Sequence, residues 1–163
     1  MRAPAVALLY PGDRAMRDRS DPAESRFAAL FEAFSRAAIN SAALLALVHS
    51  GMFEEMPDLH VVVTALALGG LMVGECLADG ARIGKDASPR HNVYVDTTGL
   101  HPVMLRAAID LVGADHVVAG TDWPVVTETD LPARLASVFN QCGLIEADRD
   151  LIAGGNARRL LHI

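Results

Sequence analysis

The sequence is poor in cysteine and in aromatic residues, and positive charge does not predominate in it. Its 163 residues include two cysteines, Cys76 and Cys142, which are too few for a disulfide framework or a zinc cluster. The formal net charge is −6 and lysine and arginine are not clustered, which argues against a nucleic-acid-binding surface. We therefore expect a protein of the reducing cytoplasm rather than a disulfide scaffold or a nucleic-acid-binding module.

Long hydrophobic runs are absent as well. The longest nearly apolar stretch, residues 61–74, contains three glycines and is shorter than the ~18 residues that span a bilayer. Residues 1–13 lack the layout of a signal peptide. Hydrophobic residues nevertheless make up 52% of the chain, which is typical of a globular protein with one core. We expect one soluble domain over residues 1–163.

Apolar runs rich in β-branched residues alternate with segments of helical periodicity. The predicted strands cover residues 4–10, 60–66, 92–98 and 115–120. The predicted helices begin at Asp21-Pro22, at Asn40 or Ser41, and near residues 52, 71, 101, 130 and 146, and a last helix is capped by Asn156. This alternation is typical of βα units on a parallel sheet.

Two α/β architectures fit the alternation. One is an open doubly wound sheet, and the other is a (β/α)₈ barrel, which needs ~250 residues when complete. In the second case the chain would correspond to a partial (half) TIM-type barrel with about four parallel βα units. In both architectures chemistry gathers at the carboxyl ends of the strands. Those ends carry Tyr10, Gly69-Gly70, Asp96-Thr97 with His101 just beyond, and Asp122-Trp123.

Four stretches occur in one order along the chain: SGMFEEMPDLHVVVTALALGG, NVYVDTTG, DHVVAGTDWP and LIAGGNARRLL. Together they resemble the C-terminal half of amidohydrolase-superfamily barrels, in the amidohydrolase-related group that includes aminocarboxymuconate-semialdehyde decarboxylase. The resemblance covers residues 4–163. It implies a metalloenzyme, usually zinc-dependent, that hydrolyses or decarboxylates a small carboxylated substrate.

The resemblance also implies roles for individual residues. Asp122, after the last strand, takes the position of a metal ligand that assists the metal-bound water or the substrate. A carboxylate is a good zinc ligand, and zinc lowers the pKa of its bound water to about 7. Trp123 is expected in the pocket wall, and His101 is a candidate substrate-binding residue on the same edge. The structural alternatives are a turn cap for Asp122, core packing for Trp123 and a helix cap for His101. For Asp96 we expect a structural hydrogen bond.

The sequence departs from the family pattern at three places. It has no His-x-His pair, Tyr10 replaces a metal-binding histidine, and Ala67 replaces the catalytic histidine of His-x-Gly-Gly. A phenol with a pKa of about 10 is a poor zinc ligand at neutral pH, and alanine ligates nothing. One hypothesis is a truncated hydrolase or decarboxylase, whose other ligands come from a complementing N-terminal half or a homo-oligomer. The other is an inactive assembly subunit. Open edges of a half barrel favour association in both cases.

Overall fold

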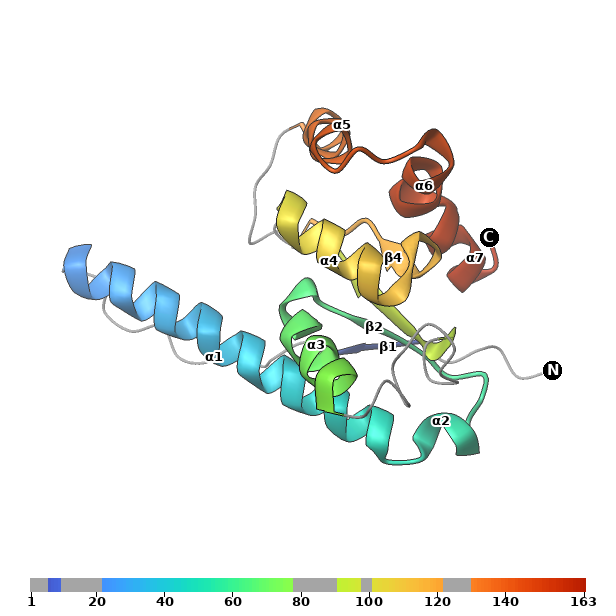
Figure 1. The fold of residues 1–163 in the computed structure, drawn as a ribbon, viewed down its shortest axis with the longest axis horizontal. Helices are drawn as coiled ribbons and strands as arrows, with labels where there is room; N and C mark the ends of the chain where they lie inside the picture. Colours follow the sequence, from blue (N-terminus) through green and yellow to red (C-terminus); the bar gives the residue numbers. More distant parts are fainter. Residues whose placement is uncertain (1–5, 10–21, 78–90, 98–100, 122–129) are drawn as a thin grey trace.

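The structure is a computed structural model, and it describes residues 6–9, 22–77, 91–97, 101–121 and 130–163 (Figure 1). The strands are β1 (Val6–Leu9), β2 (His60–Val63), β3 (Val93–Asp96) and β4 (Val117–Val118). The α-helices are α1 (Pro22–His49), α2 (Met52–Glu55), α3 (Leu68–Leu77), α4 (Pro102–Val112), α5 (Leu131–Gln141), α6 (Glu146–Asp150) and α7 (Asn156–Leu161). Two short 3₁₀ helices are η1 (Ala65–Ala67) and η3 (Ala114–His116), and one π-helical turn is η4 (Leu151–Gly155).

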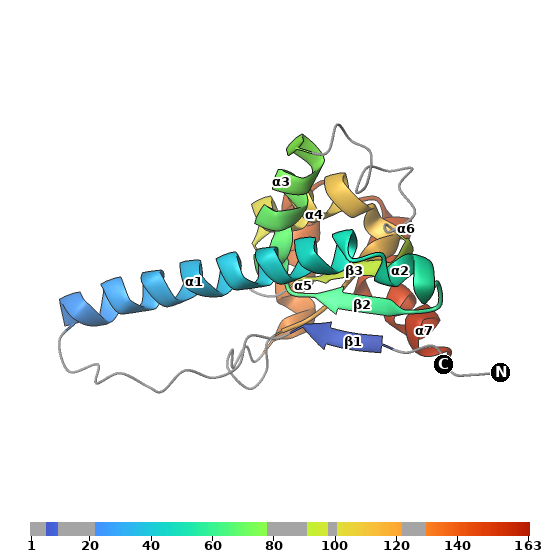
Figure 2. The same cartoon turned by 90° about the horizontal axis from the view of Figure 1, so that it is seen from below.

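The four strands form one parallel sheet in the order β1-β2-β3-β4. The register sets Val6 opposite His60, Val61 opposite Val93, and Val95 opposite Val117. The crossovers between consecutive strands contain α1, α3 and α4, and α1 and α3 lie on the same side of the sheet (Figure 2). This arrangement confirms the prediction of parallel βα units.

The hydrophobic core lies between the sheet and these crossover helices. Alternate residues of β2 are buried, as expected for a strand with one face on a core. The buried cluster joins Val61, Val63, Val95 and Val117 of the strands to Leu44 and Val48 of α1, Leu71 of α3 and Leu105 of α4. Packing of β-branched strand residues against helical leucines fixes where the carboxyl ends of the strands lie.

Several predicted boundaries are wrong. The strand predicted over residues 60–66 ends at Val63, because η1 begins at Ala65. Residues 22–49 form one helix of 28 residues, with no break at Asn40. Asn40 is buried inside the helix, and its side-chain Nδ2 donates to the Arg36 carbonyl at 2.9 Å. An asparagine that usually favours a helix cap is accommodated in this way within the helix. The strand predicted over residues 115–120 shortens to Val117–Val118, because η3 occupies the residues before it.

The outer edge of β4 is covered by the C-terminal part of the chain. The Ala119 N–H donates to the Ile152 carbonyl at 3.0 Å, and Asn156 Nδ2 donates to the Val117 carbonyl at 2.7 Å. Backbone groups of successive strand residues point to opposite edges, and the Val118 carbonyl accepts from Thr97 N on the β3 side. The expectation of an open edge is therefore wrong at β4.

The predicted cap role of Asn156 is also wrong. Asn156 is the first residue of α7, and its side chain caps no amide of that helix. Its Nδ2 instead donates to the carbonyls of Ala114 and Val117, before and within β4, both at 2.7 Å. Among the described residues, no helix is both long and apolar enough to cross a membrane.

Candidate functional site

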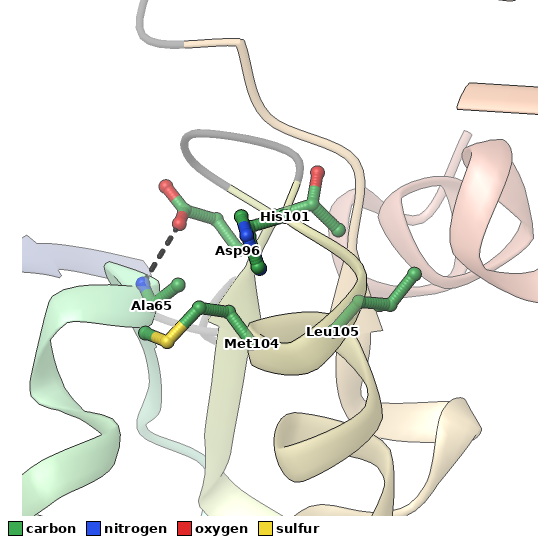
Figure 3. A pocket seen from close by; sticks show the side chains of 6 residues that line it. Ala65, Asp96, His101, Met104 and Leu105 are labelled. Atoms are coloured by element: carbon green, nitrogen blue, oxygen red, sulfur yellow. Dashed lines mark hydrogen bonds between the residues drawn. The ribbon is translucent and has the colours of Figure 1, made fainter. Parts of the chain in front are cut away.

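The carboxyl ends of β2 and β3 and the start of α4 surround a small hollow at one edge of the sheet (Figure 3). It is lined by Ala65, Asp96, Thr97, His101, Met104 and Leu105. Its empty volume of about 190 Å³ includes space that is open to solvent, and the enclosed part has room for about one water molecule. The hollow is therefore a shallow depression and not an enclosed ligand pocket. Its position agrees with the rule that chemistry gathers at the carboxyl ends of parallel strands.

Asp96 links the ends of β2 and β3. Its Oδ1 accepts a hydrogen bond from the Ala65 N–H at 3.0 Å (Figure 3). Ala65 opens η1, where the first N–H groups have no partner within the turn. Asp96 satisfies one of them, and Thr64 Oγ1 accepts from the next, the Leu66 N–H, at 3.3 Å. The predicted structural hydrogen bond of Asp96 is therefore present.

Thr97 links the ends of β3 and β4. Its Oγ1 accepts from the Gly120 N–H at 3.0 Å and donates to the Gly120 carbonyl at 3.1 Å. The side chain is buried, with 4% of its surface exposed. Sequence reasoning missed this pair. The feature that could have revealed it is a hydroxyl residue just past one strand and a glycine just past its neighbour.

His101 lies at the hollow and caps α4. Its Nδ1 accepts from the Val103 N–H at 3.3 Å, and Pro102 takes the first helical position, where an N–H is not needed. Nδ1 must be unprotonated to accept this bond, so a neutral ring carries its proton on Nε2. The capping alternative is thus observed, and the proton on Nε2 leaves His101 able to donate to a ligand.

The other positions singled out from the sequence are Ala67, Tyr10, Asp122 and Trp123. Ala67 is fully buried and belongs to the hydrophobic core cluster, so a methyl group packs where the family pattern has a histidine. Tyr10, Asp122 and Trp123 lie outside the described residues. Asp122 follows the last residue of β4 by four positions and Gly120 by two.

A metal site requires at least three donors close together. In the part of the chain that the structure describes, no three His, Cys, Asp or Glu side chains stand in such a group. Asp96 and His101 each accept a hydrogen bond from a backbone N–H. The described side chains therefore do not make up the donor set that the sequence resemblance implies.

Cys142, at the end of α5, lies beside the start of α4, and its Sγ donates to the Pro102 carbonyl at 3.3 Å. Burial raises the pKa of the Cys142 thiol, and the nearby charge of Arg106 opposes this in part. The neutral thiol is favoured in the folded chain. The resulting contribution to stability is complete below the pKa of the unfolded thiol and is lost as pH rises through the folded value.

We expect Cys142 to react slowly with 5,5′-dithiobis(2-nitrobenzoate) because the thiolate is the reacting species. In a Cys76→Ala variant at pH 8, the folded chain should react about threefold to tenfold more slowly than the same chain in urea. A folded rate equal to the unfolded rate would show that the thiol is not protected. Stopped-flow absorbance measures both rates, and far-UV circular dichroism checks that the variant is folded.

Comparisons with known proteins show the family to which the chain belongs. The family model described as amidohydrolase matches residues 6–163. Gamma-resorcylate decarboxylase from Rhizobium sp. (strain MTP-10005) is 29% identical over 132 residues, which cover 73% of this chain and 39% of that protein. The enzyme of the same name from Polaromonas sp. (strain JS666 / ATCC BAA-500) is 27% identical with the same coverage. The resemblance inferred from the sequence is thereby confirmed.

Solved structures show the same fold. 2,6-Dihydroxybenzoate decarboxylase from Rhizobium matches with a TM-score of 0.69 and 25% identity, over 98% of this chain and 51% of that chain. A Polaromonas sp. JS666 dihydroxybenzoic acid decarboxylase, with bound manganese and the inhibitor 2-nitroresorcinol, matches with a TM-score of 0.67 and 23% identity, over 95% and 49%. The chain thus spans about four-tenths of the curated relatives' length and half of these structures.

Proposed function

This chain belongs to the amidohydrolase family, and we propose that it forms part of a metal-dependent decarboxylase site for a small carboxylated substrate. Residues 1–163 then correspond to one domain equivalent to half a TIM-type barrel, with about four βα units. The observation that carries the proposal is the hollow at the carboxyl edge of the sheet, lined by Asp96, Thr97 and His101. The likeness to decarboxylases favours decarboxylation over hydrolysis.

The proposal gives each predicted site residue a role. Asp122 is a ligand of a divalent metal, for which zinc is the family's usual ion and manganese is the ion bound in the Polaromonas structure. Trp123 forms part of the pocket wall, and His101 donates from Nε2 to a carboxylate or phenolic oxygen of the substrate. The remaining ligands come from a second copy of the chain or from a complementing N-terminal half of the barrel.

Metal binding is the first test. When a second copy supplies the remaining ligands, the 163-residue chain, purified without chelator, should bind Mn²⁺ or Zn²⁺, and Asp122→Asn should weaken binding by about 100-fold or more, beyond the effect of losing an outer-shell partner. Isothermal titration calorimetry measures the affinity. Asp58→Asn, a matched change of charge at an exposed turn, should bind as the wild type does. Equal affinity of the Asp122 and Asp58 variants would refute the ligand role.

The second test measures decarboxylase activity together with the molecular mass of the active species in solution. Release of CO₂ from 2,6-dihydroxybenzoate should appear only with bound metal and only in species heavier than the single chain. Light scattering with metal analysis of each fraction separates the two requirements. Activity of a monomer would contradict the need for ligands from a second chain.

An inactive assembly subunit is the second candidate. The complete burial of Ala67 favours it, because the core offers no proton-transfer group at that position. A folded chain that binds neither Mn²⁺ nor Zn²⁺, and releases no CO₂ from 2,6-dihydroxybenzoate, would make this candidate the better one.

A further inference from the structure

We infer that Cys142 is a positioning residue for His101. Its thiol lies against the first turn of α4 and holds the backbone that orients the imidazole at the carboxyl edge of the sheet. The use of His101 as a donor to the substrate rests on the proposed function. The inference adds to it a residue from a different helix, which the family resemblance does not identify.

The orientation of His101 depends on the first turn of α4. Its Nδ1 accepts from the Val103 N–H at 3.3 Å, and its carbonyl accepts from the Leu105 N–H at 3.0 Å. Histidine is not among the preferred N-cap residues, and the bond from Val103 is longer than the ~2.7–3.2 Å typical of N–H···O bonds. The cap is therefore weak, and contacts with other elements of the fold matter for this turn.

Cys142 provides such a contact. Its Sγ donates to the carbonyl of Pro102, the residue that directly follows His101, at 3.3 Å. A carbonyl oxygen has two lone pairs, so it can accept the thiol in addition to a helical N–H. Arg106, one turn further along α4, lies close enough for its charge to act on the Cys142 thiol. The end of α5 therefore lies beside the first two turns of α4.

Cys142 is itself fixed in position, because α5 ends there in a Schellman motif. Gly143 has a φ of +62° and donates from its N–H to the Asn140 carbonyl at 3.0 Å. The Leu144 N–H donates to the Phe139 carbonyl at 3.1 Å, and both of these side chains are buried in the core cluster. The thiol thus has a fixed place relative to the core, and it transmits that place to the start of α4.

The bond to Pro102 requires a protonated thiol, since a thiolate has no proton to donate. Burial raises the pKa of the Cys142 thiol, which keeps the proton on the sulfur at neutral pH. Serine in place of Cys142 can donate to the same carbonyl, whereas alanine and valine cannot. Substitutions at this position therefore separate the hydrogen bond from the packing of the side chain.

The experiment compares Cys142→Ala, which removes the donor, with Cys142→Ser, which keeps one. Val112→Ala is the matched control, because Val112 is a buried core residue at the other end of the same helix. NMR of the isotope-labelled full-length chain, without metal or ligand, follows the ring nitrogens of His101 and the water exchange of the Val103 and Leu105 amides. The loss of ring signals in His101→Asn assigns them, and urea unfolding gives the stability of each variant.

We expect the Val103 and Leu105 amides of Cys142→Ala to exchange about threefold to tenfold faster, as the net loss of one hydrogen bond implies. The ring nitrogens of His101 should shift toward the values of free histidine, because Nδ1 is bonded for less of the time. Cys142→Ser should stay close to the wild type in both signals, and Val112→Ala should lose stability without changing either. If Cys142→Ala also loses only stability and keeps the wild-type His101 signals, its role is purely structural and the inference is overturned.

Two further outcomes are also decisive. Binding of 2,6-dihydroxybenzoate to the same chains tests the proposed role of His101 separately. If the wild-type chain does not bind it, that role fails, and the signals of ligand-free Cys142→Ala alone decide whether Cys142 positions His101. If Cys142→Ala does not fold, Cys142→Val replaces it, because valine fills the space and cannot donate. Unchanged His101 signals in that folded variant overturn the inference.

Discussion

Gly70→Ala is expected to destabilise the fold by about 1–3 kcal/mol, the usual cost of overpacking a well-packed contact. A Cβ at Gly70 would lie 2.6 Å from the Ser41 carbonyl oxygen and 2.8 Å from Ser41 Cα. These are backbone atoms of α1, so no side-chain rotation relieves the contact, and α1 and α3 have to separate. Their separation also removes contact area around Leu44 and Leu71 in the core.

The neighbouring glycine provides a matched control. A Cβ at Gly69 meets only Ser41 Oγ, at an ordinary distance of 3.4 Å. Because alanine is about 0.5–1 kcal/mol better than glycine inside a helix, Gly69→Ala should be neutral or slightly stabilising. Urea unfolding followed by circular dichroism measures both variants. Equal midpoints for the two would show that the close approach of α1 and α3 is not required.

The close packing of α3 against α1 at Gly70 also affects the candidate site. The Gly69-Gly70 pair lies in the first turn of α3, which follows η1, and the first N–H of η1 is bonded to Asp96. A shift of α3 away from α1 would therefore move Ala65 at the hollow. The close approach of Gly70 to the backbone of Ser41 indicates that this glycine serves the packing of α3 against α1.

The strands and most helices could be predicted because their signals are local. Valine-rich runs such as His60–Val63 and capping residues such as Asp130, whose Oδ1 accepts from Ala133 N at 3.0 Å, act within a few residues of their own position. The break proposed at Asn40 failed because one side-chain bond to Arg36 allows the helix to continue. Local propensity does not reveal which of two hydrogen-bonding arrangements an asparagine adopts.

The candidate site was predictable only in part. The strand-end rule predicted that His101 lies at the carboxyl edge, where it lines the hollow, and its substrate-binding role stays a prediction. The bonds of Thr97 to Gly120 join residues 23 apart, and those of Asn156 join residues 39 and 42 apart. Which residues pair in this way depends on the strand register and on how the C-terminal part of the chain folds back against the sheet. The periodicity of the sequence specifies neither of them. The ligand role of Asp122 stays a prediction.

Asn156→Ala is expected to destabilise the chain by about 3 kcal/mol. Asn156 is completely buried, and its Nδ2 donates to the carbonyls of Ala114 and Val117. A buried acceptor left without a partner costs about 1–3 kcal/mol, which applies to the Val117 carbonyl, whereas the Ala114 carbonyl keeps the Val117 N–H as a donor. Arg159 Nη2 also loses its acceptor, Asn156 Oδ1, at 3.2 Å. Urea unfolding measures the loss, with Asn140→Ala on the exposed side of α5 as the control. A difference between the two variants below about 0.5 kcal/mol, the range of surface changes, would contradict the prediction.

Asn156→Asp separates the hydrogen bonds of this residue from its packing. The side chain keeps its volume, but its amide donors are replaced by oxygen, which faces two carbonyl acceptors and accepts no bond from them. If the donors hold β4 to α7, Asn156→Asp must be at least as destabilising as Asn156→Ala, because it adds repulsion and a buried charge to the loss of the two hydrogen bonds. Lowering the pH should then recover part of the stability, since protonation removes the charge. If Asn156→Asp retains the stability of the wild type, filling the space beside β4 is what matters, and the outer edge of the sheet is closed by the Ala119 to Ile152 backbone bond instead.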